Sequence, residues 1–344
     1  MTADIKFSTC TTSGASRGRS TGAALLAVIG AGAVFMLSAC GALGALPFQS
    51  PTSTPTLTVT PAPSPTPSFT KQLLTFGSEG KGPGKLNRPE SIGVDRDGNI
   101  YVGNSEDGRI NIFDPSGKLL RSINLGTDSV VESIGVAPDG SIYTCYDSQL
   151  LKLDVRGKGS PFIYTHNAKT DAYCERYIAA GPDGSVYILN NDDQIVRFDP
   201  TGKVTLVIEN AFAPVVGFAD GNVHLAVDKT GNIYALGYNS SAVLKYSPEG
   251  KFIRRLGGRN PDNSGMAITP GRFSIPLALA VDGYGRIFVG DRLGIQVFSP
   301  NFQYVNFFKT SATVFGMAFG ANNDLYTATN YPQQVIVLAV QEPQ

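Results

Sequence analysis

Short apolar runs separated by tight turns organise the chain from about residue 86 onward. The clearest stretch is Pro89–Gly126, which reads PESIGVDRDGNIYVGNSEDGRINIFDPSGKLLRSINLG. It contains four short runs rich in β-branched and aromatic residues, each bounded by Gly, Pro, Asp or Asn. Runs of this kind are typical of β-strands joined by hairpin turns. The stretch therefore predicts a unit of four short antiparallel strands.

This unit recurs six times along the chain. The turn after the first strand of each copy is Asp97-Gly98, Asp139-Gly140, Asp183-Gly184, Thr230-Gly231, Tyr284-Gly285 and Asn322-Asn323. An aromatic residue follows three positions later each time, as Tyr101, Tyr143, Tyr187, Tyr234, Phe288 and Tyr326. The copies are 38 to 54 residues apart. A period near 40–50 residues with four strands per unit predicts an all-β fold, a six-bladed β-propeller of four-stranded antiparallel blades.

The last copy is incomplete and indicates how the ring closes. It stops after its third strand, whereas a spare run, KQLLTFG, stands at residues 71–77 before the first copy. That run matches fourth strands such as Lys118–Gly126, so we expect it to complete the last sheet and to remove the open join of the ring. The predicted propeller occupies residues 71–344. Its blades span about 86–126, 130–165, 175–209, 222–258, 275–309, and 313–340 with 71–77.

The repeat resembles the NHL-repeat propellers. The best match is Arg88–Val102, followed by Arg109-Ile110 and Phe113-Asp114, and the resemblance covers residues 71–340. Copies 2, 3 and 6 depart from the pattern, because Ala137, Gly181 and Gly320 replace the aspartate found at Asp95. In such propellers the first strands line a central channel, and ligands usually meet the starting ends of those strands.

The N-terminus has the features of an export signal. Residues 21–37 are uncharged and rich in apolar residues. This run is short for a membrane-spanning helix but typical of the apolar region of a signal peptide. They end in Leu37-Ser-Ala-Cys40-Gly41, which resembles the bacterial lipobox. The resemblance implies a signal peptide at 1–39, acylation of Cys40 and a lipid anchor at the extracytoplasmic face of the cell membrane. An ordinary signal peptide or a retained anchor helix is the alternative.

Residues 40–70 are predicted to be a disordered stalk. The segment 47–70 reads PFQSPTSTPTLTVTPAPSPTPSFT, in which Pro, Thr and Ser dominate. Such a composition cannot bury a core and favours an extended, semi-rigid chain. We expect the stalk to carry the propeller away from the membrane.

Charge and cysteine content argue against nucleic-acid binding and against a structural zinc site. The chain has 28 basic and 28 acidic residues, and a neutral protein lacks the basic field that nucleic acids require. Four cysteines without a C-x-x-C pair, together with two histidines, make a Cys/His zinc site improbable.

The start of the channel, which we call the mouth, holds the candidate site. The first strands align on Val94, Val136, Ala180, Val227, Val281 and Phe319. Four positions upstream stand Glu90, Glu132, Arg176, Val223, Leu277 and Phe315, with Glu175, Asn222 and His224 beside them. The candidate ligand-binding residues are therefore Glu90, Glu132, Glu175, Arg176, Asn222 and His224.

Three interpretations of this mouth remain open. Its charged residues can form a solvated salt-bridged rim of little energetic consequence. They can bind an external ligand such as an exported protein, a peptide or an envelope glycan, which is the role we favour. They can also support a metal-dependent hydrolase similar to the sugar-lactonase propellers, with Ca²⁺ or another divalent cation held by Glu90, Glu132 and Asn222. The histidine-dependent lyase propellers fit less well, because only two histidines are present.

Cys145 and Cys174 are the remaining cysteines of interest. Cys145 ends the second strand of blade 2 and Cys174 begins blade 3, so both are expected at the mouth face. Neighbouring blades and an exported location make a disulfide between them plausible. Two buried thiols are the alternative.

Overall fold

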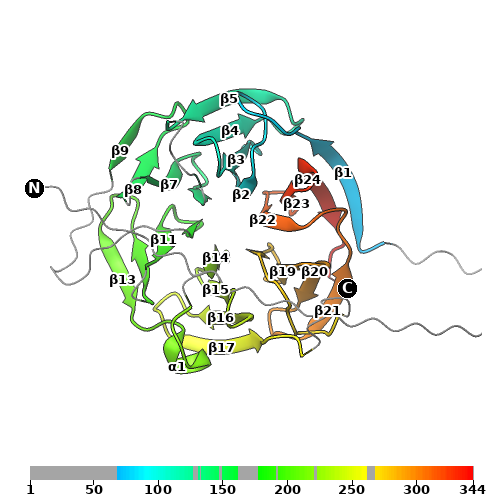
Figure 1. The fold of residues 1–344 in the computed structure, drawn as a ribbon. Coiled ribbons are helices and arrows are strands. Elements are labelled where there is room, and N and C mark those ends of the chain that lie inside the picture. The colour runs from blue at the N-terminus through cyan, green and yellow to red at the C-terminus, as the bar shows by residue number, and fades with distance from the viewer. Residues whose placement is uncertain are drawn as a thin grey trace, which may run out of the picture. The chain divides into compact units, whose positions relative to one another are not determined.

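The computed structural model describes residues 68–126, 131, 133–146, 149–161, 177–190, 193–220, 223–261 and 268–343. These residues form six four-stranded antiparallel sheets arranged in a ring (Figure 1). The predicted six-bladed β-propeller is therefore confirmed. Within the described ranges no helix is long and apolar enough to cross a membrane.

Each blade begins with the strand nearest the channel and ends with the strand at the outer rim (Figure 1). Blades 1 to 3 contain β2 (Pro89–Val94), β3 (Ile100–Asn104), β4 (Arg109–Phe113) and β5 (Leu119–Asn124); β6 (Ile134–Val136), β7 (Ile142–Tyr146), β8 (Gln149–Leu153) and β9 (Gly159–Pro161); β10 (Ile178–Ala180), β11 (Val186–Leu189), β12 (Ile195–Phe198) and β13 (Val204–Ile208). A short helix, α1 (Ala213–Val216), precedes blade 4. Blades 4 to 6 contain β14 (Val223–Val227), β15 (Ile233–Gly237), β16 (Ala242–Tyr246) and β17 (Phe252–Gly257); β18 (Ala278–Val281), β19 (Ile287–Asp291), β20 (Gly294–Phe298) and β21 (Tyr304–Phe308); β22 (Val314–Phe319), β23 (Leu325–Asn330), β24 (Gln333–Val340) and β1 (Thr70–Phe76).

The register of the inner strands confirms the alignment of the six copies. In every blade the last residue of the first strand pairs with the residue six positions later, as Val94 does with Ile100 and Phe319 with Leu325. The other four pairs are Val136–Ile142, Ala180–Val186, Val227–Ile233 and Val281–Ile287. Side chains at equal positions in the repeat therefore lie at equal depth in the channel.

The aspartate of the NHL-like repeat organises the first turn of its blade. Asp95 Oδ1 accepts hydrogen bonds from the backbone N–H groups of Asp97 and Asn99, at 2.9 and 2.8 Å. Its Oδ2 accepts from Asn99 Nδ2 at 2.8 Å and from the Tyr101 hydroxyl at 2.9 Å. Asp228 repeats this set in blade 4. In blade 2, where alanine stands at position 137, the Tyr143 hydroxyl reaches the Gly184 carbonyl of the next blade instead, at 3.3 Å.

The first and last strands close the ring as predicted. β1 pairs antiparallel with β24, so the sheet order is β1-β24-β23-β22. Just outside this pairing the Gln341 N–H donates to the Phe69 carbonyl at 2.9 Å. The sixth blade therefore combines the two ends of the propeller.

Five of the six outer strands carry a β-bulge at the same position. The register of β1, β5, β13, β17 and β21 slips by one residue there. The residues at the bulge are Leu73, Leu120, Thr205, Ile253 and Val305, and all are exposed. Bulges disrupt the free edge of a strand, which discourages pairing with another sheet.

Candidate functional site

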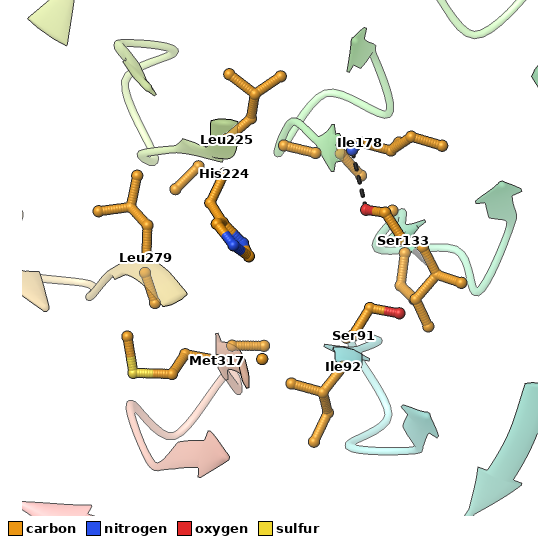
Figure 2. Close-up of a pocket in the computed structure, with 18 of the residues that line it drawn as sticks. Ser91, Ile92, Ser133, Ile178, His224, Leu225, Leu279 and Met317 are labelled. Carbon is orange, nitrogen blue, oxygen red and sulfur yellow. Dashed lines mark hydrogen bonds between the residues drawn. The ribbon is translucent and has the colours of Figure 1, made fainter. Parts of the chain in front are cut away.

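The six inner strands enclose a cavity of about 220 Å³. An apolar layer surrounds it two positions before the aligned strand ends, and its side chains are almost fully buried. This layer, which we call the apolar ring, consists of Ile92, Ile134, Ile178, Leu225, Leu279 and Met317. Figure 2 shows Ile92, Leu279 and Met317 of the ring around the space that the His224 side chain enters. The channel is therefore narrow and apolar below its mouth.

Two glycines allow the inner strands to approach one another. A Cβ atom on Gly93 would collide with the side chain of Val136, and one on Gly135 would lie 2.7 Å from Ile178 Cγ2. Both contacts would be closer than the van der Waals separation of two non-bonded carbon atoms. The small residues at this level therefore set the close spacing of blades 1 to 3 at the channel.

One position nearer the mouth, the layer becomes polar and aromatic. It contains Ser91, Ser133, Tyr177, His224, Ala278 and Gly316. The rings of Tyr177 and His224 lie in contact, with centroids 4.6 Å apart and planes at 48°. His224 is partly exposed to the channel, yet surrounding protein desolvates the imidazole and lowers its pKa to about 4. His224 is therefore neutral near pH 7.

The two serines of this layer differ in their hydrogen bonding. Ser133 Oγ accepts from the backbone N–H of Ile178 at 3.0 Å, which links the inner strands of blades 2 and 3 (Figure 2). Ser91 Oγ is buried and has no hydrogen-bond partner in the described part of the chain. A Cβ atom on Gly103 of β3 would lie only 2.5 Å from Ser91 Oγ, with Val131 and Ile134 beside it, so this hydroxyl faces the packing between blades 1 and 2 and not the channel.

Glu90 lines the cavity but already has a partner. Its Oε1 lies 2.7 Å from Arg88 Nε, and the Arg88 guanidinium also lies 3.6 Å from Glu106. A guanidinium on this carboxylate opposes a divalent cation at the same oxygen. Glu90 therefore suits an ion-paired rim better than a metal site.

Bulges at the mouth give Glu90 and Phe315 their positions. The register of β2 slips between Pro89 and Ser91, and that of β22 slips between Val314 and Gly316. Glu90 and Phe315 are the extra residues, and both line the cavity. Bulges often redirect a side chain next to a functional site.

Several predicted site residues lie outside the described residues. These are Cys40, Glu132, Cys174, Glu175, Arg176 and Asn222. Of the proposed cation ligands the structure describes only Glu90, and no group of three metal-ligating side chains occurs among the residues that it describes. Cys145 is disulfide-bonded. Its pairing with Cys174 stays a prediction.

Tyr177 is a site residue that the sequence pattern did not reveal. The alignment directed attention four positions before the aligned strand ends, whereas Tyr177 lies three positions before Ala180. His224 occupies the same position in blade 4. Reading this second layer across all six copies would have placed tyrosine and histidine on neighbouring strands.

Comparison with known proteins supports the fold at two levels. No family model matches the chain. A segment of 45 residues is 49% identical to the E3 ubiquitin-protein ligase TRIM71 of Rattus norvegicus, and 44 residues are 50% identical to that of Mus musculus. Each match covers 13% of this chain and 5% of the length of the relative. They show similarity over about one repeat and say nothing about the rest of that protein.

Solved structures share the whole architecture at low sequence identity. A streptogramin B lyase matches with a TM-score of 0.53 and 11% identity, covering 74% of this chain and 94% of its own. Virginiamycin B lyase from Staphylococcus aureus gives 0.52 and 13%, with 74% and 95% covered. A gluconolactonase from Xanthomonas campestris gives 0.54 and 12%, with 74% and 87% covered. At these identities the likeness shows the fold alone: the described part of this chain is a six-bladed β-propeller that resembles the streptogramin B lyase and gluconolactonase fold.

Proposed function

We propose that the protein is a membrane-anchored, extracytoplasmic recognition propeller of the NHL-repeat kind, and that the channel mouth binds its ligand. The lipobox at Cys40 and the Thr/Pro-rich stalk support the membrane-anchored, extracytoplasmic location. The contact between Tyr177 and His224 in the wall of the cavity supports the site. The ligand class is an exported protein, a peptide or an envelope glycan.

The Tyr177–His224 pair above the apolar ring is the observation on which the proposal rests. An aromatic face and a neutral imidazole offer stacking and hydrogen bonds without a charge to neutralise. The cavity of about 220 Å³ is smaller than most pockets for whole drug-sized ligands. It suits a side chain, a chain end or one sugar unit of a larger ligand. A histidine with a pKa of about 4 is a weak base at neutral pH, which favours binding over proton abstraction.

Proton NMR tests this role directly, because the chain has only two histidines. Short peptides and envelope-glycan fragments would be screened against residues 68–343, with the imidazole signals as the readout. We expect a ligand to shift the His224 signal, and Tyr177→Leu to weaken its binding about tenfold, a typical loss for one stacking contact. The matched control is Tyr304→Leu, which changes an exposed aromatic residue on the outer strand β21. A ligand that binds Tyr177→Leu as tightly as the parent would place its site elsewhere.

Enzymatic activity at the same mouth is the alternative. It is favoured by the three similar structures, which are those of two lyases and a gluconolactonase, and by a histidine in the channel. This alternative expects one divalent ion per chain by elemental analysis and lactone hydrolysis that Glu90→Gln abolishes. The enzyme alternative would be rejected if the preparation is free of metal and inactive on lactones. A His224 signal that responds to a peptide or glycan in the same preparation would support the recognition role.

The lipid anchor is tested separately. Expressed in a bacterial host with its own N-terminus, the protein should incorporate labelled fatty acid and fractionate with membranes. Cys40→Ser should not incorporate the label. Continued labelling of Cys40→Ser would overturn the lipobox assignment without affecting the binding site.

A further inference from the structure

The outer strand of blade 4 and the whole of blade 5 carry a concentration of positive charge that the neutral composition conceals. Residues 250–309 contain eight Lys or Arg residues and three Asp residues. Asp262 lies outside the described residues, Asp282 pairs with buried Arg286, and the Asp291 carboxylate accepts three backbone N–H groups. This sector is therefore strongly basic at its surface.

Five of the seven exposed basic residues of the sector lie on β17 or near its ends, and Arg292 and Lys309 are the other two. We call the five the basic wall: Lys251, Arg254, Arg255, Arg259 and Arg272. Within the described ranges none of the five takes part in an ion pair. Among the described residues, their side chains donate hydrogen bonds only to backbone carbonyls, from Arg254 to Asn301 at 3.0 Å and from Arg255 to Val215 at 3.4 Å.

Two of these guanidinium groups converge over Gly258. A Cβ atom at Gly258 would lie 2.7 Å from Arg272 Nη1 and 3.6 Å from Arg255 Nη2, so at most about 6 Å separates the two nitrogens. Like charges at this distance repel each other unless an anion lies between or beside them. The missing side chain of Gly258 leaves that space open.

Exposed apolar side chains lie on the same wall. Phe252 and Ile253 of β17 are 45% and 49% exposed, and Tyr304 and Val305 of β21 are 43% and 44% exposed. We call these four residues the apolar row. The Arg254 hydrogen bond to Asn301 joins β17 to the turn before β21, and Figure 1 shows both strands on the outside of neighbouring blades. On β5 of blade 1 the equivalent pair exposes only Leu120 to this extent.

We propose that the outer wall of blades 4 and 5 docks onto an anionic lipid bilayer, which replaces the expectation that the stalk holds the propeller away from the membrane. Arginines bind lipid phosphates, while aromatic and aliphatic residues enter the interface between headgroups and acyl chains. A soluble polyanion would use the basic wall but leave the apolar row without a partner. A second copy related by two-fold symmetry would bring two basic walls together. A bilayer is the partner that offers both an anionic and a hydrocarbon layer.

Vesicle co-sedimentation tests this surface. The propeller alone, residues 68–343, is suitable because its first strand closes its last sheet, and it lacks any acyl chain. We expect it to pellet with phosphatidylcholine vesicles containing about 30% phosphatidylglycerol, not with pure phosphatidylcholine, and high salt should release it. Arg255→Gln with Arg272→Gln should weaken binding tenfold or more, at roughly fivefold per basic residue. Ile253→Ser with Val305→Ser should weaken it by a similar factor.

The matched control is Leu120→Ser with Arg121→Gln, which makes the same kind of change on β5 and should bind as the parent does. Unchanged thermal unfolding of all three double variants would show that they fold. Equal binding to neutral and anionic vesicles, or an equal loss in the control, would overturn the proposal. So would binding to heparin without binding to vesicles, or a dimer in sedimentation that Ile253→Ser with Val305→Ser dissociates, because each identifies another occupant.

Discussion

Single side chains decide the chemistry of the mouth. Glu90 is held by Arg88, whereas Tyr177 and His224 offer neutral polar and aromatic groups to the cavity. The sequence placed Glu90 and His224 near the mouth, because the number of residues between each of them and the aligned strand end fixes its depth in the channel. It could not show the Arg88–Glu90 pair, since Arg88 adopts a positive φ of 56° that no local pattern signals. Nor could it show the Tyr177–His224 contact, which depends on how closely blades 3 and 4 pack.

The depressed pKa of His224 predicts a specific pH dependence of stability. The unfolded histidine titrates near 6.5, but the folded one titrates at about 4, so only the unfolded chain binds this proton between these values. The stabilising contribution is complete above pH 6.5, falls as the pH drops to about 4, and amounts to roughly 3 kcal/mol. We expect the free energy of unfolding of His224→Leu to vary less over this window than that of the parent. Urea unfolding at pH 7, 5.5 and 4 measures the difference, and an NMR titration midpoint of His224 near 6.5 would contradict it.

At the scale of elements, turn chemistry explains which copies of the repeat look regular. Asp95 and Asp228 hold their turns and a buried tyrosine hydroxyl, so the motif is legible in blades 1 and 4. Blades 2, 3 and 6 lack this aspartate, yet their strands keep the same register. The fold was predictable despite these departures, because strand period, turn glycines and buried aromatics repeat independently of the aspartate.

Asp95→Ala should test this turn. The buried carboxylate accepts four hydrogen bonds, and its removal leaves the Tyr101 hydroxyl and two backbone N–H groups without their acceptor. We expect a loss of about 2–4 kcal/mol in the free energy of unfolding, measured in urea. Asp97→Ala, an exposed change in the same turn, should cost less than about 0.5 kcal/mol. Equal effects of the two substitutions would mean that the hydrogen-bond set contributes little.

The disulfide at Cys145 gives a second prediction at this scale. Peptide mapping without reduction should recover Cys145 linked to Cys174, which would tie the second strand of blade 2 to the start of blade 3. Such a bridge restricts a loop of nearly 30 residues, so Cys145→Ser should lower the free energy of unfolding by about 3–4 kcal/mol. Recovery of Cys174 as an alkylated thiol from the unreduced protein would rule out this pairing.

At the scale of the whole molecule, the buried Arg286 side chain contacts both ends of the propeller chain. Arg286 of blade 5 pairs with Asp282 at 2.7 Å and donates to the Gln341 carbonyl beyond β24, also at 2.7 Å. Its guanidinium lies 5.7 Å from the ring of Phe69, the residue before β1. Asn99 and Asn232 fill this position in blades 1 and 4, and their shorter side chains hydrogen-bond only within their own turns. The longer arginine thus connects blade 5 to both strands that close blade 6.

This arrangement predicts that Arg286→Leu weakens closure rather than blade 5 alone. Removing the guanidinium leaves the buried Asp282 carboxylate without its cation, so we expect a loss of about 3–5 kcal/mol in the free energy of unfolding. If the arginine holds the two ends together, the substitution should accelerate amide hydrogen exchange, relative to the parent, more in β24 than in β19, the strand that carries Phe288. The same substitution in a chain that begins at residue 78, without Phe69 and β1, should cost clearly less, because part of what Arg286 holds is already absent. Equal costs in the two chains would confine its role to the turn of blade 5, and Arg292→Leu, an exposed change in the same blade, supplies the baseline for both.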